Sequence, residues 1–393
     1  MAERVYLHVG LPKTATTYLQ TILWSNRDTI EEQGVRLPGR SRRAHLWASR
    51  VIRGHPDATA QASARQHASW ERLRADIADW HGTALISHEF FAAASTEQAA
   101  RMVSELEPAE VHLVLTGREP LGLFTASWQE SIKNRDTTPM ADYARTESSE
   151  STAVWNWRTL DIHRVLERWS PVFPPERVHV LPLPGPEAPR REIWDRFAGL
   201  IGIDPECADL SQSFPNTSMG VVEAETLRRI NVHLGDFSSA IDRGTYIRTF
   251  LADERLVPRD GDPFWPDEDR IEEIRKRGQS AVDYIAAEGF HVIGDLDSLL
   301  VPDELEPRRV PESVTDAEVA QVAVELSARL LHDVRGLRHE RRALREELAA
   351  EAAESQRLLE AGVRSAVVRR YPWLRRYLWL RPVLQRKDDP PLE

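Results

Sequence analysis

Lysine and threonine residues cluster directly after an apolar segment near the N-terminus, in the sequence VYLHVGLPKTATTYLQ. Gly10 permits a tight exit from a strand, and Lys13 supplies a mobile cation. Three threonines offer hydroxyls: Thr14, Thr16 and Thr17. The first N–H groups of the following helix have no partners, and the helix dipole adds partial positive charge there. The turn therefore predicts a phosphate-binding site, and an ordinary turn with a surface lysine is the alternative interpretation.

The spacing of this turn differs from that of the nucleoside triphosphate loop. That loop reads G-x-x-x-x-G-K-[ST], whereas Lys13 comes three residues after Gly10 with no glycine directly before it. Triphosphate enzymes also hold Mg²⁺ with an aspartate at a neighbouring strand end. Here VHLVLTGR ends in Arg118, which suits a further phosphate better than a metal ion. A nucleotide-dependent kinase is therefore disfavoured and is kept as the alternative function.

Two candidates for a general base follow the apolar segment TALIS. Glu89 lies just beyond the predicted strand, and His88 is its rival because an unperturbed imidazole has a pKa nearer neutrality. A glutamate at a helix start also caps or pairs locally, which is the alternative for Glu89. His8 lies inside the first predicted strand, so we expect a core histidine whose ring nitrogens are satisfied.

Two segments carry a resemblance to a known family. LHVGLPKTATTYLQ resembles the 5′-phosphosulfate-binding loop of sulfotransferases that use 3′-phosphoadenosine 5′-phosphosulfate (PAPS), and LVLTGREPLGLFTASWQESIKN resembles their 3′-phosphate-binding strand and helix. IWDRFAGLIGID is similar to another helix of the family, and the resemblance spans about residues 4–235. It implies a P-loop-like α/β fold and transfer of a sulfuryl group from PAPS, the co-substrate, to an acceptor hydroxyl. The implied acceptor is a glycan, a glycolipid or a small metabolite, and no metal ion is implied.

The resemblance also implies roles for individual residues. Lys13 matches the lysine that contacts the 5′-phosphate and the sulfuryl group, and Arg118 matches the arginine that binds the 3′-phosphate. Glu89 lies in a place similar to that of the catalytic glutamate of glycan sulfotransferases, with His88 beside it. The implied cradle of the 5′-phosphate consists of Gly10, Leu11, Pro12, Lys13, Thr14, Ala15, Thr16 and Thr17.

The sequence departs from the family pattern at two positions. Ala15 stands where a glycine is usual, so the loop must avoid a positive φ there or accept slight strain. The family serine usually lies eight residues after the arginine, and that position is Ala126 here. We predict Ser127 for its role at the 3′-phosphate, with Thr125 as the substitute, although Ser127 is turned by about 100° on a helix.

The segment SWQESIKN after Arg118 has two interpretations. Gln129 and Lys133 share one face of a helix at i, i+4 spacing, with Glu130 beside them. They could line the cleft that receives the acceptor. The alternative is a surface Gln–Lys pair with Trp128 in the core.

Short apolar runs alternate with helical spacing along most of the chain. VYLHVG, TALISHE, VHLVLTGR and RVHVLPL predict strands of a parallel sheet, and the segments between them, such as residues 155–169, predict helices on both faces. Ligands of such sheets gather at the carboxyl ends of the strands, where three of these runs carry polar residues. The predicted fold is α/β, a P-loop-like three-layer fold with a central parallel sheet and a C-terminal helical extension.

We predict three parts of the chain. Residues 1–310 form the sulfotransferase-like α/β domain, residues 311–362 a charged helical extension, and residues 363–393 a basic aromatic tail. Thr315 and Glu318 fit a capping box at the start of the extension. A thin leucine stripe there favours either a short coiled coil, through which chains self-associate, or a solvated helix. The tail suits an anionic membrane surface, a partner, or its own domain.

Composition limits the partners and the compartment. The formal net charge of −11 over 393 residues argues against nucleic acid as a partner. One cysteine, Cys207, excludes an intramolecular disulfide framework and suits a reducing compartment. No apolar run approaches the ~20 residues of a membrane span, and the first strand leaves no room for a signal peptide. We therefore expect a cytoplasmic protein, with peripheral membrane contact through the tail, and a non-catalytic nucleotide-binding scaffold remains a further alternative.

Overall fold

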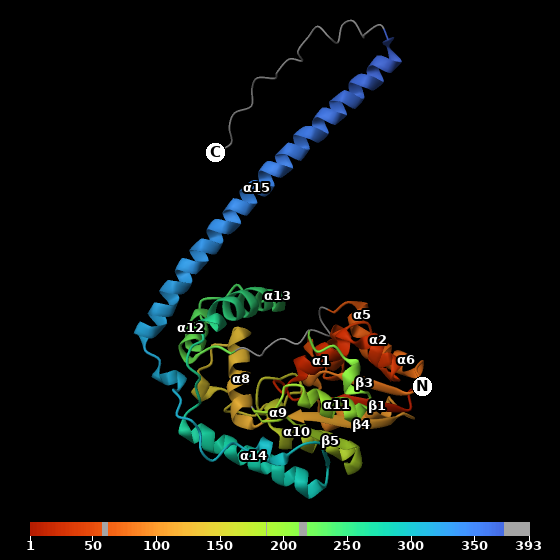
Figure 1. Cartoon of the computed structure of the whole chain (residues 1–393), viewed down its shortest axis with the longest axis vertical. Coiled ribbons are helices and arrows are strands. Elements are labelled where there is room, and N and C mark those ends of the chain that lie inside the picture. The colour runs from red at the N-terminus through yellow and green to blue at the C-terminus, as the bar shows by residue number, and fades with distance from the viewer. Residues whose placement is uncertain (57–61, 186, 212–217, 373–393) are drawn as a thin grey trace. The chain divides into compact units, whose positions relative to one another are not determined.

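The computed structural model describes residues 1–56, 62–185, 187–211 and 218–372. A parallel sheet with the strand order β2-β3-β1-β4-β5-β6 forms its centre (Figure 1). The strands are β1 (Arg4–His8), β2 (Val35–Arg36), β3 (Thr83–Ser87), β4 (Glu110–Gly117), β5 (Val178–Pro182) and β6 (His291–Val292). Because β1 lies between β3 and β4, the loop that follows β1 has the ends of both neighbours at its sides.

Both faces of the sheet are buried, as the apolar runs of the sequence require. Successive residues of a strand point to opposite faces of the sheet. In β1 and β4, residues on both faces, such as Tyr6 and Leu7 or Leu113 and Val114, are at most 4% exposed. One face packs on a cluster of helical side chains from α1, α2 and α11: Leu19, Ile22, Leu23, Ile30, Ile193, Trp194, Phe197 and Ile201. The predicted α/β fold, with helices on both faces of a parallel sheet, is confirmed.

The helices that matter for the site flank the central strands. The α-helices are α1 (Thr16–Ser25), α2 (Arg27–Glu32), α3 (Arg42–Ile52), α5 (Ala64–His67), α6 (Ser69–Ala78), α7 (Thr96–Ser104), α8 (Pro120–Lys133), α9 (Trp157–Leu160), α10 (Ile162–Trp169), α11 (Glu192–Ile201), α12 (Val221–Asn231), α13 (Ala240–Asp242), α14 (Glu268–Glu288) and α15 (Asp316–Arg370). The 3₁₀ segment η1 (Glu89–Ala93) and the π-helix η6 (Arg243–Leu256) also contribute to the site.

The elements expected from the sequence are found with two differences. The four apolar runs form β1, β3, β4 and β5, and Gly202, with φ of 80°, ends α11 as expected. The helical spacing of residues 155–169 forms two helices, because Asp161 has an extended backbone and caps α10 with its carboxylate. The two-residue strands β2 and β6 were not predicted.

The chain divides into two compact units, Met1–Val322 and a second unit from Ala323 onward. The helix α15 begins at the predicted capping box, in which the Thr315 N–H donates to the Glu318 carboxylate (2.8 Å) and the Glu318 N–H donates to the Thr315 hydroxyl (3.3 Å). Residues 373–393 of the predicted tail lie outside the described residues. In the part of the chain that the structure describes, no helix is both long and apolar enough to cross a bilayer.

Candidate functional site

The loop between β1 and α1 has an unusual backbone. Gly10, Lys13 and Ala15 have positive φ values of 72°, 66° and 59°. The left-handed conformation costs a residue with a side chain about 1–2 kcal/mol, and two such residues lie here within three positions. Of the two options that the alanine left open, strain at Ala15 is therefore the one observed. Alternation of left-handed and other residues turns successive N–H groups toward one concavity, which suits an anion.

The helix that follows this loop starts without a side-chain cap. Ala15 occupies the cap position of α1 and has no side-chain oxygen to accept the first N–H groups. At the start of α8, by contrast, the Glu119 carboxylate accepts N–H bonds from Leu121 (2.8 Å) and Gly122 (2.7 Å). A carboxylate of the chain thus caps α8, whereas the first N–H groups of α1 have no side-chain cap and could accept an anion.

The threonines of the loop have different surroundings. Thr14 is fully buried, its hydroxyl accepts the Leu11 N–H (3.1 Å), and it forms a hydrogen bond with the Thr116 hydroxyl (2.7 Å). Its hydroxyl therefore ties the loop to the end of β4. Thr16 is buried and Thr17 is exposed on the first turn of α1.

Glu89 lies directly against the loop between β1 and α1. A methyl group added to Gly10 would lie 2.7 Å from the Glu89 Cβ and 3.0 Å from the Thr16 Cγ2. The absence of a side chain at Gly10 thus lets the end of β3 approach the loop. The Glu89 carboxylate accepts a hydrogen bond of 3.0 Å from the Gln20 side chain on α1.

Glu89 and His88, at the end of β3, differ in their charge at neutral pH. The His88 ring accepts the Phe90 N–H at Nδ1 (3.1 Å) and so caps η1. Burial lowers the pKa of His88. For Glu89, burial acts to raise the pKa, but His88, the hydrogen bond from Gln20 and a backbone N–H outweigh it, and the pKa is lowered. Glu89 is therefore ionised and His88 neutral at pH 7.

Lys13 pairs with a glutamate that arrives from α8. The Lys13 ammonium and the Arg248 guanidinium of η6 both form ion pairs with the Glu130 carboxylate, whose side chain is only 6% exposed. Burial acts to raise the pKa of Glu130, but Lys13 and Arg248 outweigh it and lower the pKa. A buried carboxylate between two cations keeps one counter-charge if the other cation moves away.

Arg118 follows β4 directly and lies over the first turn of α8. A methyl group added to Gly122 would lie 2.6 Å from the Arg118 Nη2 and 2.2 Å from the Glu119 Oε1. The guanidinium and the capping carboxylate therefore share this turn. Burial raises the pKa of Glu119, although Arg118 and the capped N–H groups act in the other direction.

Neither hydroxyl proposed for the 3′-phosphate is a free donor in this structure. Ser127 is fully buried and hydrogen bonded to the Tyr143 hydroxyl (2.7 Å). Thr125, which is 8% exposed, donates to the Leu121 carbonyl one turn earlier (3.0 Å). The 100° rotation that separates Ser127 from the usual position turns it into the core, and Thr125 is also buried, so the choice between these two hydroxyls stays a prediction.

The polar residues of SWQESIKN serve the interior of the domain. Gln129 accepts the Met219 N–H (2.9 Å), and Lys133 pairs with Asp253 of η6 (2.6 Å). Both are at most 8% exposed, so the surface Gln–Lys pair is wrong, whereas Trp128 is in the core as expected. Lys133 and Arg248 together attach η6 to α8 beside Lys13.

Three buried histidines are held neutral within the sheet and beside it. His8 forms hydrogen bonds with Ser87 (2.8 Å) and Thr116 (3.2 Å), so the expected core histidine is confirmed. Burial lowers the pKa of His8, His45 and His179 to about 4. Among the described residues, no group of three or more histidine, cysteine, aspartate or glutamate side chains is arranged to hold a metal ion.

Sequence reasoning missed the residues that connect the loop with its neighbours. Gln20 lies one turn beyond the loop on α1, and Arg248 belongs to η6, more than 230 residues away along the chain. The i, i+4 position relative to Thr16 could have suggested Gln20. No local signal pairs Arg248 with Glu130.

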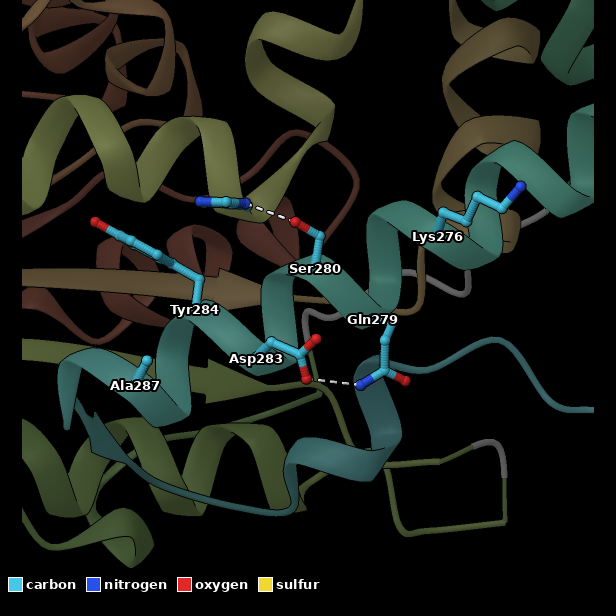
Figure 2. A pocket seen from close by; sticks show the side chains of 7 residues that line it. Lys276, Gln279, Ser280, Asp283, Tyr284 and Ala287 are labelled. Atoms are coloured by element: carbon cyan, nitrogen blue, oxygen red, sulfur yellow. Dashed lines mark hydrogen bonds between the residues drawn. The ribbon is translucent and has the colours of Figure 1, made fainter.

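A separate open cavity of about 490 Å³ lies on α14 and α10 (Figure 2). His163 forms a hydrogen bond with the Ser280 hydroxyl (2.7 Å), an arrangement that resembles the nucleophile and base of a catalytic triad. The Asp283 carboxylate accepts from Gln279 (2.8 Å) and does not orient His163. The cavity therefore lacks the third member of a catalytic triad, and none of the predicted site residues lines it.

Comparison with known proteins gives little beyond the fold. No family model matches the sequence, and no curated protein matches it. Among solved structures, the chain is similar to a sulfotransferase from Alicyclobacillus acidocaldarius, with 16% identity, a TM-score of 0.36, and coverage of 53% of this chain and 85% of that chain. At this identity and TM-score the likeness assigns no function.

Replacement of Ala15 by glycine should stabilise the protein. Ala15→Gly removes a left-handed penalty of about 1–2 kcal/mol and adds an entropic cost of about 0.5–1 kcal/mol. We expect a gain of about 0.5–1 kcal/mol in the free energy of unfolding, measured by urea denaturation with tryptophan fluorescence. Ala75→Gly in the exposed middle of α6 is the control and should lose about 1 kcal/mol. An equal loss in both variants would contradict strain at Ala15.

Gly10→Ala should disrupt the contact between the loop and Glu89. Gly34 also has a positive φ (85°), but a methyl group there would meet nothing within 4 Å. Gly34→Ala therefore incurs only the backbone penalty, whereas Gly10→Ala also displaces Glu89 or the loop. We expect Gly10→Ala to lose about 1–3 kcal/mol more than the control, measured in the same denaturation experiment. Equal losses would show that Glu89 is not packed on Gly10.

Proposed function

We propose that the protein transfers the sulfuryl group of PAPS to an acceptor hydroxyl. The observation that carries the proposal is the strained, uncapped loop at the start of α1, with Lys13 in it and Glu89 packed against it. Left-handed residues with side chains persist only where the surrounding structure enforces them, and they cluster at ligand-binding sites. The sequence resemblance to PAPS-dependent enzymes supplies the identity of the ligand.

The donor would lie along the carboxyl ends of β1 and β4. The 5′-phosphate occupies the loop from Gly10 to Thr17, and Arg118 binds the 3′-phosphate. Arg118 lies over Gly122 and Lys13 reaches Glu130, positions eight residues apart on α8, which corresponds to roughly 12 Å along the axis. A ribose that carries phosphates on both sides can bridge this separation.

The reaction is an in-line displacement at sulfur. The acceptor oxygen attacks the sulfuryl group, the bond from sulfur to the phosphate oxygen breaks, and the acceptor proton passes to the Glu89 carboxylate. Lys13 stabilises the negative charge that develops on the leaving phosphate oxygen. His88 holds the start of η1 and stays the rival base.

Donor binding requires Lys13 to turn from Glu130 toward the phosphate. Glu130 is 6% exposed, so it would be left as an unpaired buried charge if Lys13 were its sole partner. Arg248 remains on the carboxylate and reduces the cost of this movement. Arg248 is thereby a positioning residue for Lys13.

Calorimetry with adenosine 3′,5′-bisphosphate in the absence of Mg²⁺ tests the donor site. Arg118→Ala should weaken binding by about tenfold to a hundredfold, because a hydrogen bond to a charged group is worth about 1.5–3 kcal/mol. It should also abolish discrimination against adenosine 5′-monophosphate, and Lys13→Ala should abolish turnover. Arg72→Ala on the exposed side of α6 is the control. Unchanged discrimination would refute the role of Arg118, and a preference for Mg-ATP would favour the kinase.

An acceptor screen with isotopically labelled PAPS tests the transfer itself, and the pH profile tests the base. Because the pKa of Glu89 is lowered, its carboxylate is already ionised at pH 6. The rate should therefore stay level between pH 8 and pH 6 and fall only as the pH drops through that lowered pKa.

Glu89→Gln should reduce kcat by about 10²–10⁴ and leave donor affinity unchanged. His88→Asn keeps an acceptor for the Phe90 N–H, and if it removes activity while Glu89→Gln does not, His88 is the base.

A further inference from the structure

The exposed apolar side chains of α15 lie on one side of the helix. Between residues 324 and 362, the exposed large hydrophobic residues are Val324, Leu331, Val334, Leu337, Leu344, Leu348, Leu358 and Leu359. With Val334 as an a position, all of them fall at a, d or e of a heptad, and none at b, c, f or g. In a helix that is surrounded by water on all sides, exposed apolar residues would be expected at all heptad positions.

The core positions of the heptad form a continuous stripe. The a and d residues from Leu330 to Leu358 are Leu330, Val334, Leu337, Arg341, Leu344, Leu348, Glu351, Ser355 and Leu358. The five of them among the exposed residues, Val334, Leu337, Leu344, Leu348 and Leu358, are 45–67% exposed. In a single chain this stripe leaves large apolar side chains in water, which favours burial against another helix.

The two flanks of the stripe carry opposite charges. The g positions are Asp333, Glu340, Glu347 and Glu354, and the e positions include Arg338 and Arg345. In a parallel pair of helices, g of one helix faces the next e of the other, five residues further along. This places Glu340 opposite Arg345 and Asp333 opposite Arg338. In an antiparallel pair, g faces g and e faces e, so acidic residues would meet acidic ones and arginines would meet arginines.

We propose that a second copy of this chain covers the stripe, and that α15 forms a parallel, in-register dimeric coiled coil over about residues 330–358. Identical chains bring the acidic flank of one helix to the basic flank of the other at both sides of the interface. An anionic membrane would require basic residues on both flanks, and the acidic g flank excludes that occupant. The proposal is independent of the reaction proposed above.

Dimerisation also accounts for the stability of so long a helix. In proteins most helical stability comes from packing of an apolar face and not from intrinsic propensity. In α15 all residues from Arg335 to Gly362 are exposed, and Arg342–Glu346 (2.9 Å) is an ion pair along its outer side, at positions b and f. A second helix supplies the missing packing.

The polar core residues specify the register. In register, Arg341 at an a position and Glu351 at a d position each face their own copy, and these like charges weaken the core. Arg341 also lies next to the acidic g residue Glu340 of the second helix. A slip by one heptad would set Arg341 against Val334 or Leu348, and Glu351 against a leucine. Each charge would then lie among apolar side chains in four places and not two, so the in-register dimer is favoured.

Sedimentation velocity of the full chain tests the association. The dimer should have twice the 44.8 kDa mass of the chain. The measurement spans about 1–100 µM, which detects dissociation constants in the same range. Leu344→Glu with Leu348→Glu, at d and a, should give monomers. Ala343→Glu with Ala350→Glu, both at c, adds the same charge on the outer side and should leave the dimer intact. A monomeric wild-type chain, or equal behaviour of the two variants, would overturn the proposal.

Cysteine cross-linking tests the orientation in a Cys207→Ser background. Leu337→Cys and Leu358→Cys are both at d and lie about 31 Å apart along the helix. In a parallel, in-register dimer each variant should form a disulfide with its own copy, because the two Cα atoms must approach within about 7 Å. An antiparallel pair brings at most one of the two positions to its own copy. Ala350→Cys at c is the control and should not cross-link.

Charge reversal tests the flanks. Glu340→Arg and Arg345→Glu should each weaken the dimer by about tenfold, since each places like charges opposite one another at two symmetric sites. The double variant restores opposite charges and should regain the wild-type dissociation constant. Helicity by circular dichroism confirms that each variant is folded. If Glu340→Arg strengthens the dimer, the helices are antiparallel and the proposed geometry is wrong.

Discussion

The close contact between Gly10 and Glu89 is the constraint on which the candidate site depends. It exists because Gly10 has no side chain and a positive φ, so the end of β3 can approach the loop after β1. The same loop is tied to β4 through Thr14 and Thr116 and to α8 through Lys13 and Glu130. The central position of β1 in the sheet makes all these contacts short-range in space although they are distant in sequence.

Charge is distributed unevenly between the two helix starts at this sheet edge. The start of α8 contains its own carboxylate, Glu119, whereas α1 begins at a strained alanine without a cap. The cations at the site are also held differently. Lys13 shares a buried carboxylate with Arg248, and Arg118 lies beside a capping glutamate. Lys13 is thus held by a buried carboxylate, and Arg118 lies beside a half-buried one. This arrangement is compatible with the doubly phosphorylated ligand that we propose.

The sequence predicted the sheet and the loop because both depend on local patterns. Segments of five or more mostly apolar residues located β1, β3, β4 and β5, while β2 and β6 have two residues each and leave no periodicity to detect. Glycine at position 10 and lysine at position 13 located the loop. The partners of that loop could not be predicted, because Arg248 reaches Glu130 through a π-helix whose place is set by tertiary packing. Ser127 illustrates a different limit. It lies one position after Ala126, which is partly exposed, and this single step along the helix places its side chain in the core.

The neutral histidines beneath the site make the domain sensitive to acid. His8 bridges β3 and β4 directly under the loop, and burial keeps its pKa near 4, as it does for His45 and His179. In the unfolded chain these rings become protonated as the pH falls below about 6.5. In the folded chain they stay neutral until the pH reaches about 4. Between pH 6.5 and pH 4, each of these histidines therefore shifts the folding equilibrium toward the unfolded state as the pH falls. Acidification should therefore loosen the centre of the sheet, and with it the platform that holds the loop.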